Sequence, residues 1–510
     1  MADYAGNACT DDIRLKRLLA EAGLAIPEIL LPDPAKACYN KWAVVACDQF
    51  TSQKAYWNGV EAYVGDAPSS LRLILPEIFL SDGFAARVGS IHEKMDEYVI
   101  GHIFAEPLNG FILTERVFSS DGAYSGHNSG GGARWGLVAA VDLEKYSYEH
   151  GAKTLIRSTE ATVSDRLPPR MAIRRGAALE LPHVLVLIDD ESNALIEPLA
   201  ADAEAGRLEK IYDFELMAGG GHIRGYKVGG LAIEKAAAAI GGLLREASDR
   251  LHDETPVRNS PDSGTSLGDP LLFAVGDGNH SLAAAKAYWD EIKSTLPDGA
   301  AEGWPARYAL VELINLRSEA VVFEPIHRAL YDTDINMVFE EARSFFADKD
   351  FSAASYGLDA DEHSQVYCSG AVADCSSTVA DCCGTVADCC GAVADCCGAG
   401  FTYNVFYGGG GKALFHIGHP ADSLPVAELQ QFLDHLCARH PGIKIDYIHG
   451  IGELTRLSRE EGCVCFELPP VNKDGFFASV IKNGALPRKS FSMGEATDKR
   501  YYLEARKIKP

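Results

Sequence analysis

The stretch Leu271-Leu-Phe-Ala-Val-Gly-Asp-Gly-Asn-His-Ser-Leu-Ala-Ala-Ala-Lys286 carries the strongest structural signal in this chain. Residues 271–275 are all apolar, which predicts a buried strand, and the alanine-rich residues that end the stretch predict a helix. The glycines between them predict a turn. The first backbone N–H groups of a helix have no partner within it, and the helix dipole favours negative charge there. A strand, a glycine turn and a helix start in this order therefore predict an anion site.

The turn also carries two side chains suited to catalysis. Asp277 and His280 add a carboxylate and an imidazole at its tip, and Asp277 is a candidate Mg²⁺ ligand. Glycines let a backbone approach a ligand closely. The remaining turn residues are predicted to bind phosphate: Gly276, Gly278, Asn279 and Ser281. The alternative is an ordinary strand-to-helix turn in which Ser281 or Asn279 is the N-cap.

A second cluster lies at residues 157–170. Its three arginines, Arg157, Arg166 and Arg170, are predicted to bind phosphate, because guanidinium groups bind phosphate as a bidentate fork. Glu160 is the best general-base candidate outside the glycine turn. The alternative is a capped helix whose charged residues make surface ion pairs.

Four further residues are candidates for substrate binding. Asp48 and Gln49 follow an apolar run at residues 42–47, which predicts a strand. His183 directly precedes another apolar run, and His222 follows three glycines. The alternatives are a histidine with satisfied hydrogen bonds for His183 and a flexible hairpin turn for the segment around His222.

Composition limits the classes of protein to consider. The chain has 510 residues, 47% of them hydrophobic, and a formal net charge of −25. Its length predicts two or more domains. The acidic excess argues against nucleic-acid binding, which requires a basic face. No apolar stretch is long enough to span a bilayer and the first residues do not resemble a signal peptide, so we expect a soluble cytoplasmic protein with no membrane partner. The P-loop, zincin and hydrolase-elbow signatures are all missing.

The cysteines are unevenly distributed. Of 14 cysteines, eight lie in residues 368–397, where Val-Ala-Asp-Cys recurs every seven residues. Vicinal Cys pairs at this period do not match zinc-site spacing, which favours a low-complexity insertion that arose by tandem duplication. A cluster for soft metals is the alternative. The six other cysteines are scattered, as in a reduced compartment.

The order of predicted elements indicates an α+β fold with mixed sheets and flanking helices. Helices and strands follow one another without strict βαβ alternation. Residues 252–269 are polar and rich in Asp, Ser, Pro and Gly, which predicts a linker. We therefore expect an N-terminal lobe over residues 1–251 and a C-terminal lobe over 270–510, with the insertion at about 357–400.

Seven segments carry a more specific signal: Trp42-Ala-Val-Val-Ala-Cys-Asp-Gln-Phe-Thr-Ser-Gln53, Leu155-Ile-Arg-Ser-Thr-Glu160, Leu181-Pro-His-Val-Leu-Val-Leu-Ile-Asp-Asp190, Phe273-Ala-Val-Gly-Asp-Gly-Asn-His-Ser281, Tyr308-Ala-Leu-Val-Glu-Leu313, Asp446-Tyr-Ile-His-Gly450 and Leu486-Pro-Arg-Lys-Ser-Phe-Ser-Met-Gly-Glu495. Together they resemble a large bacterial family of unknown function over residues 26–506. Its members usually carry Asp-Gly-His-His-Arg at the glycine turn. That motif is similar to one in the free serine kinases, which have a ParB/sulfiredoxin-like fold and phosphorylate serine with ADP or ATP.

The resemblance implies a ParB/sulfiredoxin-like element around the turn, and ATP or ADP with Mg²⁺ as cofactors. Asp277, Gly278 and His280 match the Asp, Gly and second His of the motif. Asn279 replaces the first His and Ser281 replaces the Arg, so the arginines of residues 157–170 would have to supply that charge. Glu160 is a loose match to the catalytic glutamate of the kinases.

Three functional hypotheses follow. The first is a nucleotide-dependent phosphotransferase that acts on a small hydroxyl metabolite such as serine, in which the turn binds phosphate and Glu160 takes the hydroxyl proton. The second is a sensor that binds a nucleotide or metabolite at the same site without turnover. The third is a phosphatase for a small metabolite. Each predicts a small-molecule partner, and assembly into a homo-oligomer is left open.

Overall fold

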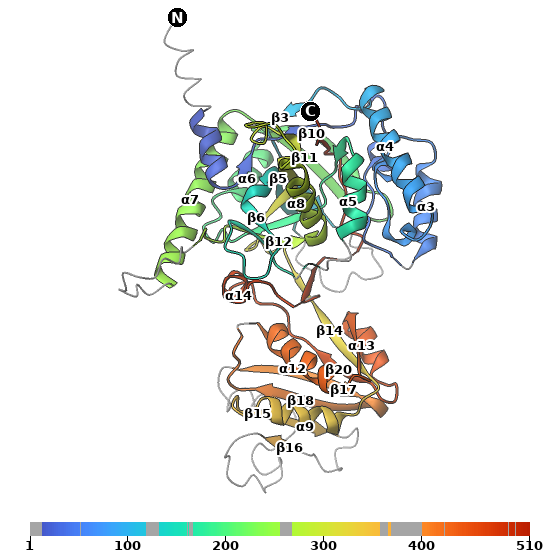
Figure 1. The fold of residues 1–510 in the computed structure, drawn as a ribbon, viewed down its shortest axis with the longest axis vertical. Helices are drawn as coiled ribbons and strands as arrows, with labels where there is room; N and C mark the ends of the chain where they lie inside the picture. The colour runs from blue at the N-terminus through green and yellow to red at the C-terminus, as the bar shows by residue number, and fades with distance from the viewer. Residues whose placement is uncertain are drawn as a thin grey trace, which may run out of the picture. The chain divides into compact units, whose positions relative to one another are not determined.

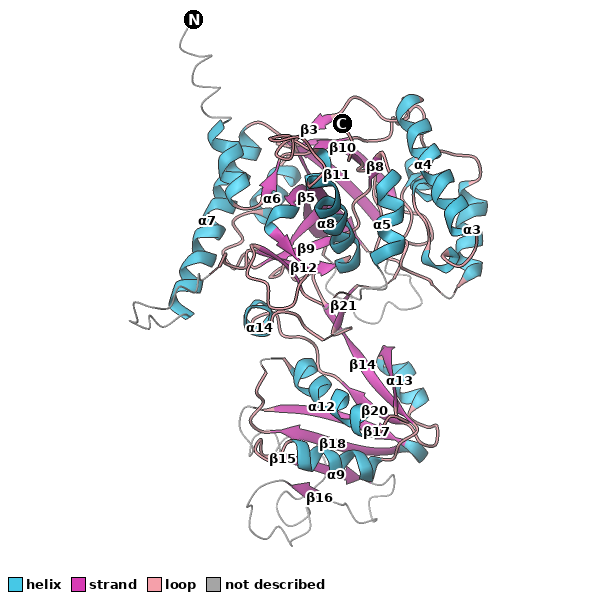
Figure 2. Cartoon of the chain, viewed as in Figure 1, coloured by secondary structure: helices cyan, strands magenta, loops and turns pink. Residues whose placement is uncertain are grey.

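The chain forms two units in the computed structural model. The structure describes residues 13–51, 53–118, 132–160, 162, 167–254, 268–356, 366–368, 400–422, 424–487, 489–494 and 496–510. Unit 1 comprises Met1–Val322 and Met493–Pro510, and unit 2 comprises Phe323–Ser492. In both units helices flank β-sheets (Figures 1 and 2); the large sheet of unit 1 has parallel and antiparallel pairs, and the pairs described in unit 2 are antiparallel, which agrees with the predicted α+β class.

Unit 1 is built on a ten-stranded sheet in the order β10-β11-β4-β5-β13-β9-β12-β7-β6, with β1 paired to β5. The strand β12, which carries the predicted turn at its end, pairs in parallel with β7 and antiparallel with β9. The bounds are β1 Leu24–Ala25, β4 Phe111–Val117, β5 Arg134–Asp142, β6 Tyr146–Ser147, β7 Ile156–Ser158, β9 Leu185–Ile188, β10 Glu209–Glu215, β11 His222–Val228, β12 Phe273–Asp277 and β13 Tyr308–Asn315. The central strands are buried apolar runs, as expected of a sheet covered on both faces.

Helices cover this sheet. The helix α8 (Asn279–Lys293) follows the turn and buries Leu282, Ala285 and Trp289 in the core of unit 1. It packs beside α5 (Leu167–Gly176), as Figure 1 shows. The other helices are one at residues 13–21, α2 (Tyr39–Trp42), α3 (Lys54–Val64), α4 (Phe84–Ile100), α6 (Ile196–Glu204) and α7 (Leu231–Glu254). No helix of the described residues has the length and apolar character needed to cross a membrane.

The predicted division into lobes at residues 252–269 differs from the structure. The strand after this segment, β12, lies between β7 and β9 of the same sheet, so the chain on both sides of the segment belongs to unit 1. The last residues also belong to unit 1, where β22 (Arg506–Lys507) pairs with β8 (Leu179–Glu180). Polar composition marks an exposed connection, whereas the division is set by long-range strand pairing that composition does not reveal.

Unit 2 contains an eight-stranded sheet in the order β16-β15-β18-β17-β20-β14-β19, with β21 paired to β14. Its strands are β14 Phe323–Tyr331, β15 Phe351–Tyr356, β16 Val366–Cys368, β17 Phe401–Tyr407, β18 Gly411–Ile417, β19 Lys444–His449, β20 Val464–Glu467 and β21 Phe491–Met493. Its helices are α9 Ile335–Phe345, α12 Pro425–Arg439, α13 Ile451–Leu457 and α14 Phe476–Asn483. The Val-Ala-Asp-Cys repeat of the predicted insertion lies outside the described residues.

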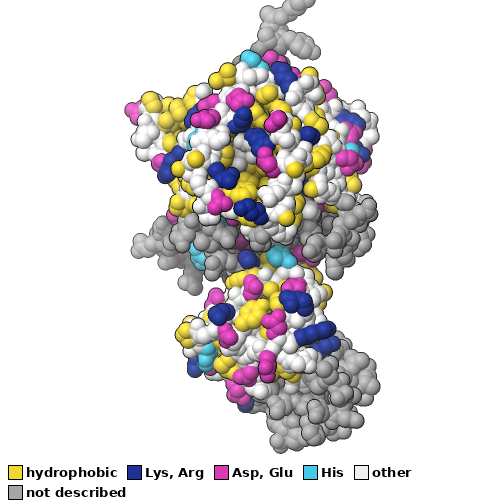
Figure 3. Space-filling view, turned by 90° about the vertical axis from the view of Figure 1, so that its right-hand side faces the viewer, with side chains coloured by type: hydrophobic (Ala, Val, Ile, Leu, Met, Phe, Trp, Pro, Cys, Tyr) yellow, Lys and Arg dark blue, Asp and Glu magenta, His cyan; other side chains and the backbone are white. Residues whose placement is uncertain are grey.

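Charged side chains of both signs are interspersed on the face of the molecule in Figure 3. The net charge of −25 is therefore not concentrated in a single acidic region of that face.

Candidate functional site

The site of unit 1 is organised by an extended segment near the C-terminus. Residues 44–46 run antiparallel to residues 499–501. The N–H of Ala46 donates to the carbonyl of Lys499 at 2.7 Å, and the N–H of Tyr501 donates to that of Val44 at 3.0 Å. Residues 42–47 are predicted to form a strand, but Trp42 is the last residue of α2 and residues 44–46 pair with residues 499–501 and not with a strand of the sheet. This local pairing and the end of α2 bury the apolar residues. The pairing brings Asp48 and Lys499 to the same region.

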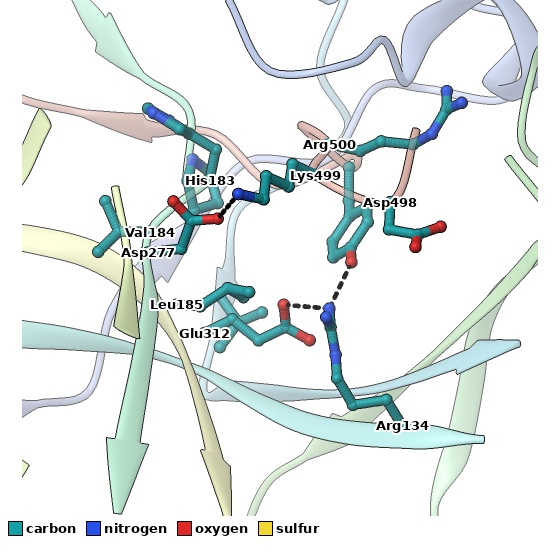
Figure 4. A pocket seen from close by; sticks show the side chains of 12 residues that line it. Arg134, His183, Val184, Leu185, Asp277, Glu312, Asp498, Lys499 and Arg500 are labelled. Carbon is teal, nitrogen blue, oxygen red and sulfur yellow. Dashed lines mark hydrogen bonds and ion pairs between the residues drawn. The ribbon is translucent and has the colours of Figure 1, made fainter. Parts of the chain in front are cut away.

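Successive side chains of an extended segment point to opposite sides. Lys499 points toward Asp277, whereas Arg500 points away from it (Figure 4). A small cavity runs between the two sides, and the residues that line it are Arg134, Val138, Pro182, His183, Val184, Leu185, Asp277, Glu312, Asp498, Lys499, Arg500 and Tyr502. The cavity volume is about 20 Å³, which is room for about one water molecule. A nucleotide therefore does not fit inside it.

On the side of the segment to which Lys499 points, Lys499 and Asp277 form an ion pair. The Lys499 ammonium lies 2.8 Å from Asp277 Oδ2, and both side chains are largely buried. Asp277 Oδ1 accepts the backbone N–H of Gly278 at 2.8 Å. Burial alone would lower the pKa of Lys499, but Asp277, Asp48 and Glu160 outweigh it and raise this pKa above its ordinary value. Lys499 is therefore a firmly charged cation beside three carboxylates.

His183 and Asp48 complete this side. Nε2 of His183 is 2.9 Å from the Ser281 hydroxyl, and the ring packs on Tyr501 with centroids 4.7 Å apart. Burial lowers the pKa of His183 against the opposing charges of Asp48 and Asp277, so the imidazole is neutral at pH 7. Burial would raise the pKa of Asp48, but His183, the Gln49 amide and Lys499 together lower it, so Asp48 is ionised.

Asn279 connects the start of α8 to the end of β7. Its amide oxygen accepts the Ser158 hydroxyl at 2.6 Å and the Thr159 N–H at 3.2 Å. Both contacts are buried, and they place Glu160, the next residue after Thr159, within electrostatic reach of Lys499. The amide oxygen of Asn279 is thus committed to a structural role.

The turn offers fewer backbone N–H groups for phosphate binding than predicted. The N–H of Gly278 is bonded to Asp277, and that of Ser281 donates to the carbonyl of Gly278 at 2.9 Å. Gly278 itself is the N-cap, at φ 78°, in place of Ser281 or Asn279. Gly276 has a packing reason to be glycine, because a Cβ there would lie 2.5 Å from Met493 Sδ.

The structure brings six of the predicted site residues to one side of the segment, or to the turn that adjoins it. These residues are Asp48, Gln49, Glu160, His183, Asp277 and Ser281. His280 lies in the first turn of α8 and is half-buried. Arg170 pairs with Glu77, although its charge still acts on Asp48 and His183.

Three other predictions have a different outcome. Arg157 is buried and donates to the carbonyl oxygens of Thr154 and Asp269, both at 2.9 Å, so it stabilises a turn. His222 is bonded to Asp213 at 2.5 Å and to Glu215 at 2.8 Å on β10, and it is not among the residues that line the cavity. Arg166 lies outside the described residues.

Lys499 was missed at the sequence level. It lies 222 positions from Asp277, beyond the last of the segments that carry the family resemblance, which ends at Glu495. No local pattern marks it, because its role depends on the long-range pairing of residues 44–46 with 499–501.

The prediction that Asp277 binds Mg²⁺ does not fit the donor set. Its Oδ1 accepts the N–H of Gly278, and its Oδ2 is ion-paired with Lys499. Within the described part of the chain, no three His, Cys, Asp or Glu side chains are grouped as metal ligands. The chemistry below is therefore derived without a metal.

Fold and site together define an α+β protein with a buried ion pair at a strand–helix junction. The family model "Protein of unknown function (DUF1015)" matches residues 32–377. The chain belongs to this family, which confirms the family predicted from the sequence. Comparison with curated proteins finds no match.

Several solved structures are similar at low identity. A conserved hypothetical protein from Pyrococcus furiosus is 10% identical, and the match covers 73% of this chain and 95% of that one, with a TM-score of 0.30. A free serine kinase in complex with AMP is 11% identical, with 72% and 91% covered and a TM-score of 0.29. A variant free serine kinase in complex with ADP is 11% identical, and the match covers 72% of this chain and 92% of that one, with a TM-score of 0.31. TM-scores this low do not establish a common fold, so the chain is identified by its family.

Proposed function

We propose that unit 1 catalyses phosphoryl transfer from a nucleotide to the hydroxyl group of a small metabolite such as serine. The observation that carries this proposal is the ion pair of Asp277 and Lys499 at the N-terminus of α8, with Glu160 and Asp48 within electrostatic reach of the same ammonium. A fixed cation, a helix N-terminus and a nearby carboxylate are the groups that this reaction needs.

The proposed step is a direct displacement. The acceptor hydroxyl oxygen forms a bond to the terminal phosphorus, the bond from that phosphorus to the bridging oxygen of the nucleotide breaks, and the hydroxyl proton passes to the Glu160 carboxylate. Lys499 neutralises charge on the transferred phosphoryl group, and Asp277 orients Lys499 through their 2.8 Å contact. Because the cavity has room for little more than a water molecule, the nucleotide would bind outside it, over the turn.

The ParB/sulfiredoxin-like element belongs to this proposal. It would comprise β12, the turn and α8, with β7 beside β12 supplying Glu160. Because β7 and β12 are parallel neighbours, Glu160 and the turn follow the same ends of these strands, which supports a base and a phosphate site close to one another. A small-molecule substrate and a nucleotide are the partners that follow.

The test is thermal unfolding with AMP, ADP, ATP and serine, with and without Mg²⁺. Saturation at about 100 times the Kd is expected to stabilise the protein by about 2.7 kcal/mol. Asp277→Asn and Lys499→Met are expected to abolish the nucleotide response, and Glu160→Gln is expected to retain it while losing phosphorylated product. Arg175→Gln is the control, because Arg175 makes an exposed pair with Glu291.

Two outcomes would redirect the proposal. No response to any nucleotide would refute phosphoryl transfer at this site. A nucleotide response without product in any acceptor screen would favour the sensor.

A phosphatase is the second candidate, and one contact favours it. The Ser281 hydroxyl lies 2.9 Å from the neutral imidazole of His183, which could take the hydroxyl proton. Ser281→Ala separates the two functions. A kinase with Glu160 as base would retain turnover in this variant, whereas a phosphatase with Ser281 as nucleophile would lose hydrolysis of phosphoserine.

A further inference from the structure

The extended segment at residues 498–502 has a buried cluster of charges on the side to which Arg500 points. Three arginines, Arg116, Arg134 and Arg500, lie near Glu312 and Asp498. Arg134 is bonded to Glu312 at 3.1 Å and to the Tyr502 hydroxyl at 3.0 Å. These two bonds pair the Arg134 charge with a carboxylate.

Arg116 is also provided with acceptors. It donates to three backbone carbonyls, of Val117, Gly220 and His222, and lies 3.9 Å from Asp498. The terminal nitrogens of Arg116 and Arg134 thus have acceptors or a paired carboxylate, although Nε of each is buried without a hydrogen-bond partner among the described residues.

Arg500 is different from the other two. Only 3% of its surface is exposed, and its Nε donates to the carbonyl of Thr497 at 2.7 Å. Its two terminal nitrogens, Nη1 and Nη2, are buried and have no hydrogen-bond partner among the described residues. A buried charge without acceptors is costly, and such a group in a folded protein usually indicates a missing partner. Burial lowers the pKa of Arg500 to about 10, which leaves it charged at pH 7.

A second unsatisfied donor lies near Arg500. The Tyr56 hydroxyl is buried without a hydrogen-bond partner among the described residues, and its ring packs against the apolar cluster that contains Val45 and Tyr501, the pairing partner and the chain neighbour of Arg500. The Tyr56 ring is held by stacking on Phe50, with centroids 3.9 Å apart. A hydroxyl and a guanidinium without acceptors, from segments far apart in the sequence, therefore meet in one buried region.

The glycine turn at residues 219–221 makes room for this guanidinium. A Cβ at Gly220 would lie 2.4 Å from both Cζ and Nη2 of Arg500, so the group lies flat against the backbone. Arg224 is the arginine that lies nearest to this turn in the sequence. Arg224 is paired with Glu115 at 2.8 Å, and Arg500 takes the position beside the turn.

We propose that Nη1 and Nη2 of Arg500, together with the Tyr56 hydroxyl, bind a small oxyanion, the carboxylate or phosphoryl group of a metabolite, for which the cavity of about 20 Å³ that Arg500 lines would have to widen. A guanidinium presents two parallel donors that match two oxygens of either group. The other charges of the cluster are two arginines against Glu312 and Asp498, so one added anion balances Arg500. This site is separate from the Asp277–Lys499 pair and does not depend on phosphoryl transfer.

The test compares thermal unfolding of unit 1 in an anion-poor buffer with unfolding after addition of inorganic phosphate, formate, serine or phosphoserine. All five tryptophans lie in unit 1, so their fluorescence reports this unit alone. Wild type is expected to gain stability with at least one of the four. Arg500→Met is expected to lose that gain, and Tyr56→Phe is expected to weaken the apparent affinity about tenfold, as for the loss of one hydrogen bond to a charged group.

Arg157→Met is the matched control. Arg157 is also a buried arginine of unit 1, but carbonyl oxygens satisfy it. This variant is expected to have a lower melting temperature in every buffer and to keep the response to the anion. Arg500→Met is expected to melt no lower than wild type in the anion-poor buffer, because it removes an unpaired buried charge. Phosphate and formate distinguish the phosphoryl from the carboxylate source.

Two results would overturn the inference. The first is that wild type responds to none of the four compounds. The second is that Arg500→Met responds as strongly as wild type. Asp277→Asn distinguishes this failure from failure of the proposed function, since it is expected to lose the nucleotide response and keep the oxyanion response.

Discussion

Glu504→Gln is expected to stabilise unit 1 at pH 8 and to change its stability by less than about 1 kcal/mol at pH 5. The Glu504 side chain is fully buried. Its Oε1 accepts the Tyr212 hydroxyl at 2.7 Å, and its Oε2 has no hydrogen-bond partner among the described residues. Burial raises the pKa of Glu504 to about 7, with a smaller contribution from the Glu312 charge. The folded protein therefore prefers the neutral carboxyl.

The magnitude follows from this pKa. A rise from 4.5 to about 7 corresponds to about 3 kcal/mol of unfavourable interaction with the carboxylate form. Between these two pH values the folded state binds more protons than the unfolded state, so stability falls as pH rises and then stays level above pH 7. Glutamine is neutral throughout, so this variant is expected to gain about 3 kcal/mol over wild type at pH 8 and nothing below pH 4.5.

Urea unfolding followed by tryptophan fluorescence measures this difference in unit 1. Glu180→Gln is the matched control, because Glu180 is also buried but its pKa is lowered: burial would raise it, and Arg506 and Arg174 outweigh burial. That variant is expected to be destabilised at pH 8, with a difference that narrows as pH falls below about 4.5. An equal change for Glu504→Gln at pH 5 and pH 8 would refute the reasoning.

Three further predictions concern the turn and its ion pair. Asn279→Ala leaves the buried Thr159 N–H without its acceptor, while the Ser158 hydroxyl can still donate to the carbonyl of Glu160, so we expect a loss of about 1–3 kcal/mol in urea unfolding, and a loss within error would contradict the structural role. Gly278→Ala adds a Cβ 3.0 Å from neighbouring backbone, at a residue whose φ is 78°. It is expected to destabilise the protein more than Gly299→Ala, because Gly299 has nearly the same φ, 79°, but open space around the added Cβ. Equal losses in the two variants would mean that backbone strain alone causes the destabilisation. Lys499→Met leaves a largely buried carboxylate unpaired and is expected to cost about 2–3 kcal/mol. Addition of Asp277→Asn is expected to recover most of that loss, and strictly additive losses in the cycle would argue against the pair.

The sequence predicted the local elements of the site well. Five consecutive apolar residues before Gly276 gave the position of β12, and the alanines after the turn gave α8, because both signals depend only on neighbouring residues. Side chains at the ends of these elements, such as Asp277 and Glu160, were therefore found. The domain boundary was not found, because residues 252–269 have the composition of a linker but connect two elements of one sheet.

The basic residues of the site were predicted less well, for a physical reason. Arginines close together in sequence seemed to form a phosphate site, yet Arg157 and Arg170 have protein partners that satisfy or pair them. A cation can bind a ligand only when its own protein has not already paired it. Whether a cation is paired depends on residues far away in sequence, so composition cannot predict it.

The same criterion explains why the 498–502 segment matters. Lys499 and Arg500 are consecutive, but the backbone pairing with residues 44–46 sends their side chains to opposite sides. Lys499 meets a carboxylate, and Arg500 meets none at hydrogen-bonding distance. One backbone register therefore holds Lys499 in an ion pair and leaves the terminal nitrogens of Arg500 to bind an anion. A shift of that register by one residue would turn each of the two side chains to the opposite side and separate Lys499 from Asp277, so the ion pair depends on this register.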